Sequence, residues 1–202
     1  MKKTCIVVLA VIALAIPATS SAQQLFDFDG QVNLPVNVGE TLSMVAVVLD
    51  GSPALTTPIP LDFANFEYTL VIDGLELASV SGDTEFYAGG TLTLYEDTGT
   101  AADYANPPSF SDGTALLVGT FSTLSRSTLL SLTQATGSVD WTSGSRIGDL
   151  APADRLDWGF FASASTAEAV AGYDENWDGK VEPREPVVSG DARSFGALKA
   201  GF

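Results

Sequence analysis

Hydrophobic and polar residues alternate along much of this chain. In the segment "LFDFDGQVNL", Phe26 and Phe28 fall on one face of an extended backbone, and Asp27 and Asp29 fall on the other. A period of two residues is typical of a β-strand that buries one face. The chain is therefore expected to begin its folded part with a strand.

Further segments of the same kind follow, separated by clusters of Gly, Pro, Asn and Asp. They cover residues 41–50, 65–73, 75–81, 85–97, 114–122, 128–136, 137–143 and 156–165. Short strands at this spacing predict an all-β fold, and we expect a single antiparallel β-sandwich, either a jelly roll or an immunoglobulin-like Greek key. Up-and-down barrel closure is the alternative. One short helix is expected over 165–172.

The first 22 residues have the organisation of a signal peptide. A basic "MKK" precedes the apolar run "TCIVVLAVIALAIP", and "ATSSA" supplies small residues before a cleavage point after Ala22. No later segment approaches the roughly 20 apolar residues of a membrane-spanning helix. We therefore expect a bacterial protein that is secreted to the extracellular medium or cell surface, with residues 23–202 as one domain and no membrane span after processing.

The charge and the His and Cys content of the chain exclude several classes of partner and of catalytic site. The chain has 25 acidic and 9 basic residues and a net charge of −16, which becomes −18 when Lys2 and Lys3 leave with the signal peptide. Such a field repels nucleic acid and attracts divalent cations. The chain has no His, and its one cysteine, Cys5, lies in the signal peptide. The imidazole-dependent mechanisms and typical zinc sites are thereby excluded, and we expect no enzyme.

One stretch, "DENWDGKVEPRE" at residues 174–185, has the spacing of a calcium loop. Oxygen ligands are needed at loop positions 1, 3, 5, 7, 9 and 12, with Gly at position 6 for a sharp turn. Gly179 falls at position 6, and the apolar Val181 falls at position 8. Trp177 at position 4 is expected to point outward, where it is able to contact a neighbouring molecule. The alternative is an acidic turn that matches by chance.

These dozen residues resemble the calcium loops of EF-hand and dockerin-type modules. The resemblance implies a structural Ca²⁺ ion as cofactor. The implied ligands are Asp174, Asn176, Asp178, the backbone carbonyl of Lys180, Glu182 and Glu185. Pro186 limits any exiting helix to about one turn, so a paired EF-hand or a dockerin is not expected.

Aromatic residues offer a second interpretation, because sugar-binding sandwiches stack pyranose rings on exposed aromatic side chains. The candidates are Trp141, Trp158, Trp177, Tyr87, Tyr95 and Tyr104. Trp141 and Trp158 alternate with polar neighbours in strand fashion, so we expect both in the core.

The N-terminal strand at 25–34 has two possible partners. It pairs within its own sheet, or it leaves as a donor strand and completes the sheet of the next copy, burying Phe26 and Phe28 there. The C-terminal segment ends in Phe202 and is another candidate for such a contact. We expect a self-assembling extracellular subunit of a filament or surface layer, joined to copies of itself by strand complementation. The alternative is an extracellular module that binds polysaccharide or protein.

Overall fold

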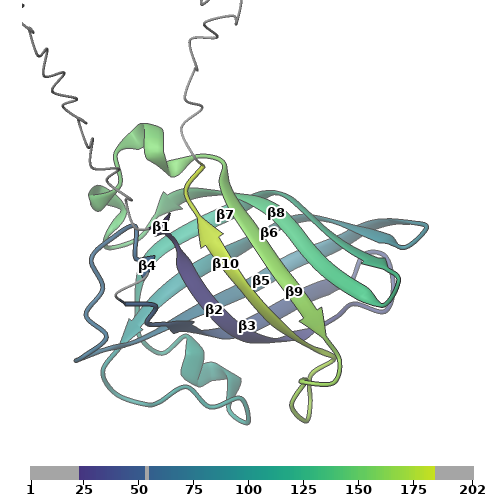
Figure 1. The fold of residues 1–202 in the computed structure, drawn as a ribbon, viewed down its shortest axis with the longest axis horizontal. Helices are drawn as coiled ribbons and strands as arrows, with labels where there is room; N and C mark the ends of the chain where they lie inside the picture. The colour runs from purple at the N-terminus through teal and green to yellow at the C-terminus, as the bar shows by residue number, and fades with distance from the viewer. Residues whose placement is uncertain (1–22, 53–54, 185–202) are drawn as a thin grey trace, which may run out of the picture.

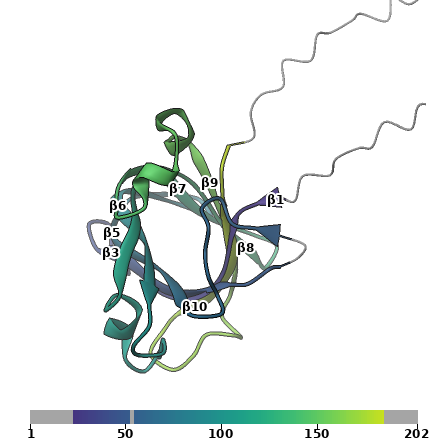
Figure 2. The ribbon, with the colours of Figure 1, turned by 90° about the vertical axis from the view of Figure 1, so that its left-hand side faces the viewer.

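The described part of the chain folds into a closed barrel of eight antiparallel strands. The structure, a computed structural model, describes residues 23–52 and 55–184. Figure 2 shows the strands arranged in a ring. They are β2 (Phe26–Asn33), β3 (Thr41–Leu49), β5 (Glu67–Ser81), β6 (Thr84–Asp97), β7 (Thr114–Leu129), β8 (Leu132–Ser143), β9 (Trp158–Ser165) and β10 (Glu175–Glu182).

Each barrel strand pairs with the next one along the chain, and the last strand pairs with the first. β10 lies between β9 and β2 (Figure 1), and its pairing with β2 runs from Val181 opposite Phe26 to Glu175 opposite Val32. Because this pairing closes the sheet on itself, the predicted β-sandwich, whether jelly roll or Greek key, is wrong. The up-and-down barrel that the strand spacing left as the alternative is the fold found.

Short elements lie outside the barrel. β1 (Gln23–Gln24) and β4 (Leu55–Thr56) form a small parallel pair. Three 3-10 turns occupy long connections: η1 (Pro107–Phe110), η2 (Ile147–Asp149) and η3 (Pro152–Arg155). The helix predicted over 165–172 is wrong, because these residues end β9 and continue as a turn. The Val170 amide of this turn donates to Gln31 Oε1 at 2.9 Å and so fixes the turn against β2.

The two ends of the barrel differ. The connections 34–40, 82–83, 130–131 and 166–174 lie at one end, which we call the hairpin end. Residues 144–157, with η2 and η3, lie at the opposite end, which we call the terminal end because β10 also ends there. In Figure 1 the β5–β6 and β7–β8 hairpins extend to the right and η2 and η3 lie at the upper left.

Aromatic side chains fill the barrel interior next to the closing pair of strands. Phe26 stacks on Trp158 with ring centroids 6.0 Å apart, and Trp158 meets the edge of Trp141 at 5.6 Å. Phe28 stacks on Phe160 at 5.5 Å. All five are at most 2% exposed, so the expectation that Trp141 and Trp158 are core residues is confirmed.

An ionic network occupies the interior near the hairpin end. Arg126 of β7 binds both carboxylate oxygens of Glu175 of β10, and its Nη1 lies 3.1 Å from Glu85 Oε2 of β6. The Tyr87 hydroxyl donates to Glu85 at 2.7 Å, and Trp177 Nε1 donates to Glu175 at 3.0 Å. Burial and the neighbouring Glu85 raise the pKa of Tyr87 above its usual range, so it remains a donor. The network ties three strands into one register.

Replacing Arg126 by Met is expected to destabilise the fold. Glu175 is 2% exposed, and without the guanidinium its carboxylate stays buried without a counter-charge. Breaking one partner of a buried pair costs about 3–5 kcal/mol. The loss should shrink at acidic pH, because a carboxyl group that is buried without a counter-charge costs less in its neutral form. Urea unfolding at pH 7 and pH 4 measures both effects.

The matched control is Arg146→Met. Arg146 pairs with Asp149 at 2.5 Å, but the two side chains are 34% and 38% exposed, so about 0–1 kcal/mol is expected. Equal losses for the two variants, or a loss for Arg126→Met that does not depend on pH, would contradict the assignment of Glu175 as a buried, charge-compensated carboxylate.

Candidate functional site

The stretch predicted as a calcium loop is strand β10. Its side chains alternate, so that Glu175, Trp177, Gly179 and Val181 face the interior. Gly179 is extended rather than turned, and a Cβ there would lie 2.2 Å from the Phe161 carbonyl oxygen and 2.8 Å from Phe28 Cζ. This glycine therefore serves close packing of β9, β10 and β2, not the sharp turn of an EF-hand loop.

The implied ligands do not converge on one point. Asn176, Asp178, Lys180 and Glu182 follow one another along the outer face of β10, with about 6.6 Å between successive members of the row. Asp174 accepts the Leu34 amide at 2.7 Å, and Glu185 lies outside the described residues. Among the described residues, no group of three His, Cys, Asp or Glu is placed to hold a metal ion. The arrangement does not fit an EF-hand or dockerin-type site.

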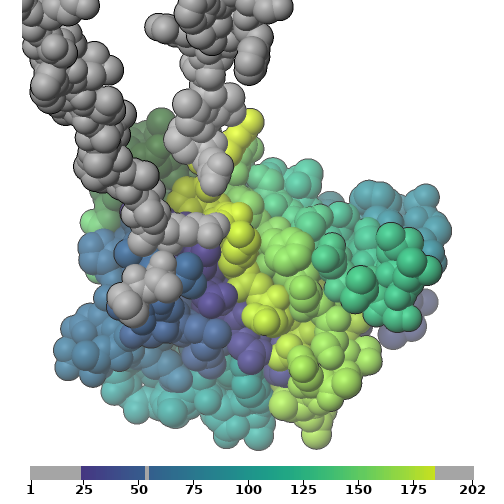
Figure 3. All heavy atoms as spheres, in the orientation of Figure 1, coloured from purple at the N-terminus to yellow at the C-terminus, as the bar shows by residue number. Residues whose placement is uncertain are grey.

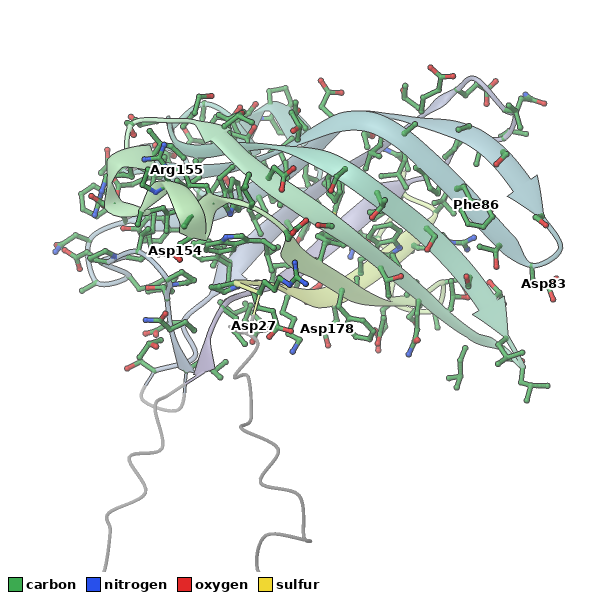
Figure 4. The ribbon with its side chains drawn as sticks, turned by 90° about the horizontal axis from the view of Figure 1, so that it is seen from above. Asp27, Asp83, Phe86, Asp154, Arg155 and Asp178 are labelled. Atoms are coloured by element: carbon green, nitrogen blue, oxygen red, sulfur yellow. The ribbon has the colours of Figure 1, made fainter. Side chains whose placement is uncertain are left out.

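The outer face of β10 instead meets acids of β2. Asn176 Nδ2 donates to Asp29 Oδ1 at 2.5 Å, and Asp178 lies opposite Asp29. Burial raises the pKa of Asp27 above its usual range, and the nearby charge of Asp178 adds to this effect while Lys180 opposes it. Figure 4 shows Asp27 and Asp178 close together. The two carboxylates destabilise each other at neutral pH.

The residues predicted for assembly do not lie on a free surface. Phe26 and Phe28 are 0% exposed, and their strand pairs with β3 and β10 of the same chain. Trp177, expected to point outward, is also 0% exposed and packs on Phe160 at 6.1 Å. Phe202 lies outside the described residues. Of the sugar-stacking candidates, Tyr87 is buried, and Tyr95 and Tyr104 are half-buried.

An apolar tip projects from the hairpin end. It consists of Leu129, Leu130 and Leu132 at the β7–β8 turn, which are 71%, 90% and 71% exposed. The neighbouring β5–β6 hairpin lies alongside, because Thr128 donates its amide to the Asp83 carbonyl at 3.0 Å. Figure 3 shows both hairpins at the right-hand edge of the molecule. Leucine side chains that are this exposed contribute little to the stability of the fold.

The backbone of this tip is strained. Leu130 and Ser131 have φ values of 50° and 71°, in the left-handed region that Gly and Asn occupy far more easily. A two-residue hairpin turn usually contains Asn-Gly or Asp-Gly at these positions. Unfavourable backbone conformations persist mostly where function requires them. The tip therefore combines an exposed apolar surface with a backbone that a more stable sequence would avoid.

A pocket lies at the opposite, terminal end. Its volume is about 610 Å³, and its wall includes Leu150, Ala153, Leu156 and Pro58. Leu156 is 56% exposed. Asp157, also in the wall, has a φ of 58°. Among the described residues other than glycine, only Asp157, Leu130 and Ser131 have a positive φ. All the strained non-glycine positions of the described chain thus lie at the apolar tip or at this terminal pocket.

The two ends also differ in charge. Arg155 and Arg184 belong to the terminal end, whereas Arg126 is the one described cation of the hairpin end and is already paired inside the barrel. Figure 4 shows Asp83 at one extreme of the molecule and Arg155 at the other. Arg155 Nε donates to the Leu150 carbonyl at 3.0 Å, and no carboxylate among the described residues pairs with it. The terminal pocket itself is acidic on balance, because Asp149, Asp154 and Asp157 line it and Arg184 is its one cation.

Sequence reasoning missed the apolar tip for a definite reason. The segment "TLLSLTQAT" predicts one strand over 128–136, because it contains no Gly, Pro, Asn or Asp that marks a turn. In the structure the chain reverses inside it, at Leu130 and Ser131. The available signal was the adjacent pair Leu129 and Leu130, which interrupts the alternation of apolar and polar residues.

Replacing Asp27 by Asn is expected to stabilise the fold at pH 7. The pKa of Asp27 in the folded state lies above its ordinary value of 3.8, so the ionised carboxylate costs stability, and this cost grows as pH rises through the folded pKa. Below about pH 3.8 the cost is absent in both proteins. Urea unfolding should show a gain at pH 7 that disappears near pH 3. No gain at pH 7, or the same gain with the exposed Asp112→Asn, would contradict the assignment.

None of the described helices is long and apolar enough to cross a membrane. No family model, no curated protein and no solved structure matches this chain.

Proposed function

We propose that this protein is a structural subunit of an exported assembly, in which copies join end to end through the apolar tip of one copy and the terminal pocket of the next. The observation that carries the proposal is the exposed leucine tip on a strained turn. Contiguous exposed apolar side chains mark interaction sites. Export follows from the predicted signal peptide.

The geometry of the two surfaces favours a head-to-tail contact. Tip and pocket lie at opposite ends of one barrel, so a contact between them is heterologous, and repetition gives a filament rather than a closed pair. The leucines of the tip match Leu150, Ala153, Leu156 and Pro58 in the wall of the pocket. A second copy is the occupant that we propose, because each copy carries both the apolar tip and the apolar wall that receives it.

A single contact of this kind is weak. Burying a leucine side chain is worth about 1.5–3 kcal/mol, so three leucines that are mostly exposed supply roughly 5 kcal/mol. Association costs at least about 4 kcal/mol of translational and rotational freedom. Assembly is therefore expected only at high local concentration, as in a secreted layer or matrix, and monomers should dominate in dilute solution.

Strand complementation is not part of this proposal. β2 is hydrogen-bonded to β3 on one side and to β10 on the other, so its donation to a neighbour would open the barrel and expose Phe26 and Phe28. The ends of the barrel offer contacts that leave the closed sheet intact.

The variant Leu130→Asn tests the tip. Asn tolerates the left-handed conformation, so the variant should unfold at a higher temperature, by about 2–4 °C for each kcal/mol of relieved strain. The same change should abolish concentration-dependent association in sedimentation velocity. The control Leu49→Ser alters another exposed leucine, 41% exposed, and should associate like the wild type. Unchanged association of a well-folded Leu130→Asn protein would sink the proposal.

A mixing experiment identifies the occupant of the pocket. Leu130→Asn keeps the pocket, and Leu156→Ser keeps the tip. Neither variant should elongate alone, and an equimolar mixture should stop at dimers, because only one productive contact remains. Dimers of Leu156→Ser alone would show a tip-to-tip contact instead and would contradict head-to-tail joining.

A further inference from the structure

The seam between β6 and β7 is interrupted halfway along. Registered pairing stops at Tyr87 opposite Leu124 and resumes at Thr91 opposite Thr120. On the β6 side, Gly89 and Gly90 have φ values of 68° and 76°, which a residue with a side chain rarely adopts. Irregularities that interrupt a ladder are frequent beside binding sites, where they re-aim neighbouring side chains.

A groove of about 490 Å³ lies over this interruption. Its wall includes the hydroxyl side chains Ser122, Thr123, Ser125, Thr136 and Ser138. No charged side chain lines it, although the whole chain carries 25 acids. The volume falls within the range of small-molecule sites.

Phe86 stands at the edge of the groove. It is 43% exposed, and no other aromatic side chain among the described residues is as exposed. Figure 4 shows Phe86 toward the hairpin end, where Asp83 lies, and far from Arg155 at the terminal end. It lies opposite Ser125 of β7 across the seam, so its ring and the hydroxyl row share one face of the sheet.

The hydroxyl groups are arranged in advance of any ligand. Ser125 Oγ and Thr136 Oγ1 lie 3.4 Å apart across β7 and β8, and Ser122 Oγ donates to the Ser138 carbonyl at 3.2 Å. Ser138 Oγ is buried without a hydrogen-bond partner. Because the protein covers this oxygen, Ser125 and Thr136 supply the hydroxyl groups that a ligand in the groove can reach.

We propose that this groove binds a neutral saccharide chain, with one sugar ring stacked on Phe86 and its hydroxyl groups bonded to Ser125 and Thr136. The C–H bonds on a pyranose face carry partial positive charge, and an aromatic face is negative. Hydroxyl groups both donate and accept, as do those of a sugar. A purely apolar ligand would leave the groove hydroxyls unpaired, and an anionic polysaccharide would meet a net negative protein with no cation in the groove.

The saccharide groove goes beyond end-to-end assembly, because it lies on the side of the barrel and remains available in a filament. It would attach assembled copies to a surrounding polysaccharide. The two proposals rest on different residues, and each fails or survives by itself.

Binding is measured by NMR titration of residues 23–202 with neutral hexasaccharides, one of β-1,4-linked glucose and one of β-1,4-linked N-acetylglucosamine, and with oligogalacturonate as the anionic comparison. We expect at least one neutral chain to bind and oligogalacturonate not to bind. Phe86→Ala should weaken binding at least tenfold, Phe86→Trp should retain it, and Thr136→Val should weaken it several-fold.

Two controls separate this test from folding and from assembly. Val80→Ala alters an exposed apolar residue of the same hairpin outside the groove, and Leu130→Asn removes the apolar tip. Both should bind saccharide like the wild type. The proposal is overturned if the wild type binds neither neutral chain, if it binds oligogalacturonate as well, or if Phe86→Ala and Val80→Ala bind equally.

Discussion

The pairing of β10 with β2 is the constraint on which the rest of the structure depends. It joins residues 175–181 to residues 26–32, near the two limits of the described chain. Without it, β2 and β10 would both be edge strands with unpaired backbone groups, and the aromatic cluster of Phe26, Phe28 and Trp158 would lose its cover. Closure satisfies both edges at once and leaves the barrel strands no edge to offer a neighbour.

Closure also decides where function is able to reside. The interior next to β2 and β10 is filled by aromatic rings, and the interior near the hairpin end is filled by Arg126 with Glu85 and Glu175. The surfaces that carry a proposal therefore lie outside: the apolar tip, the terminal pocket and the groove over the β6–β7 seam. Each of them coincides with a departure from regular backbone, either a positive φ outside glycine or an interrupted ladder. A regular barrel wall would have none of these features.

Much of the strand content was predictable from the sequence, but closure was not. Alternation shows that one face of a strand is buried, and this holds equally for a sandwich and for a barrel. The choice depends on whether "FDFDGQVN" meets "ENWDGKVE", a pairing across almost the whole domain that no local pattern records. The core positions of Trp141 and Trp158 were predictable because they depend only on local alternation.

The calcium prediction failed for a related physical reason. The first ligands of an EF-hand loop stand at every second position, which is also the period of a strand, so Asn176 and Asp178 fit both patterns. The residue between them separates the two cases: Trp177 is large and apolar and fills the interior of the barrel. Gly179 fits both patterns as well, in one case as a turn and in the other as a close approach of strands.

The most direct test of closure is a disulfide between β2 and β10. Asp29 and Asp178 lie directly opposite each other on the outer face of β2 and β10, at the separation of about 4.5–5.5 Å between Cα atoms that a disulfide accepts. Residues 23–202 contain no cysteine, so the substitutions Asp29→Cys and Asp178→Cys would introduce the only two thiols. After mild oxidation at low protein concentration, a non-reducing gel should show a monomer without free thiols. Disulfide-linked ladders, or thiols that stay free in folded protein, would contradict closure within one chain.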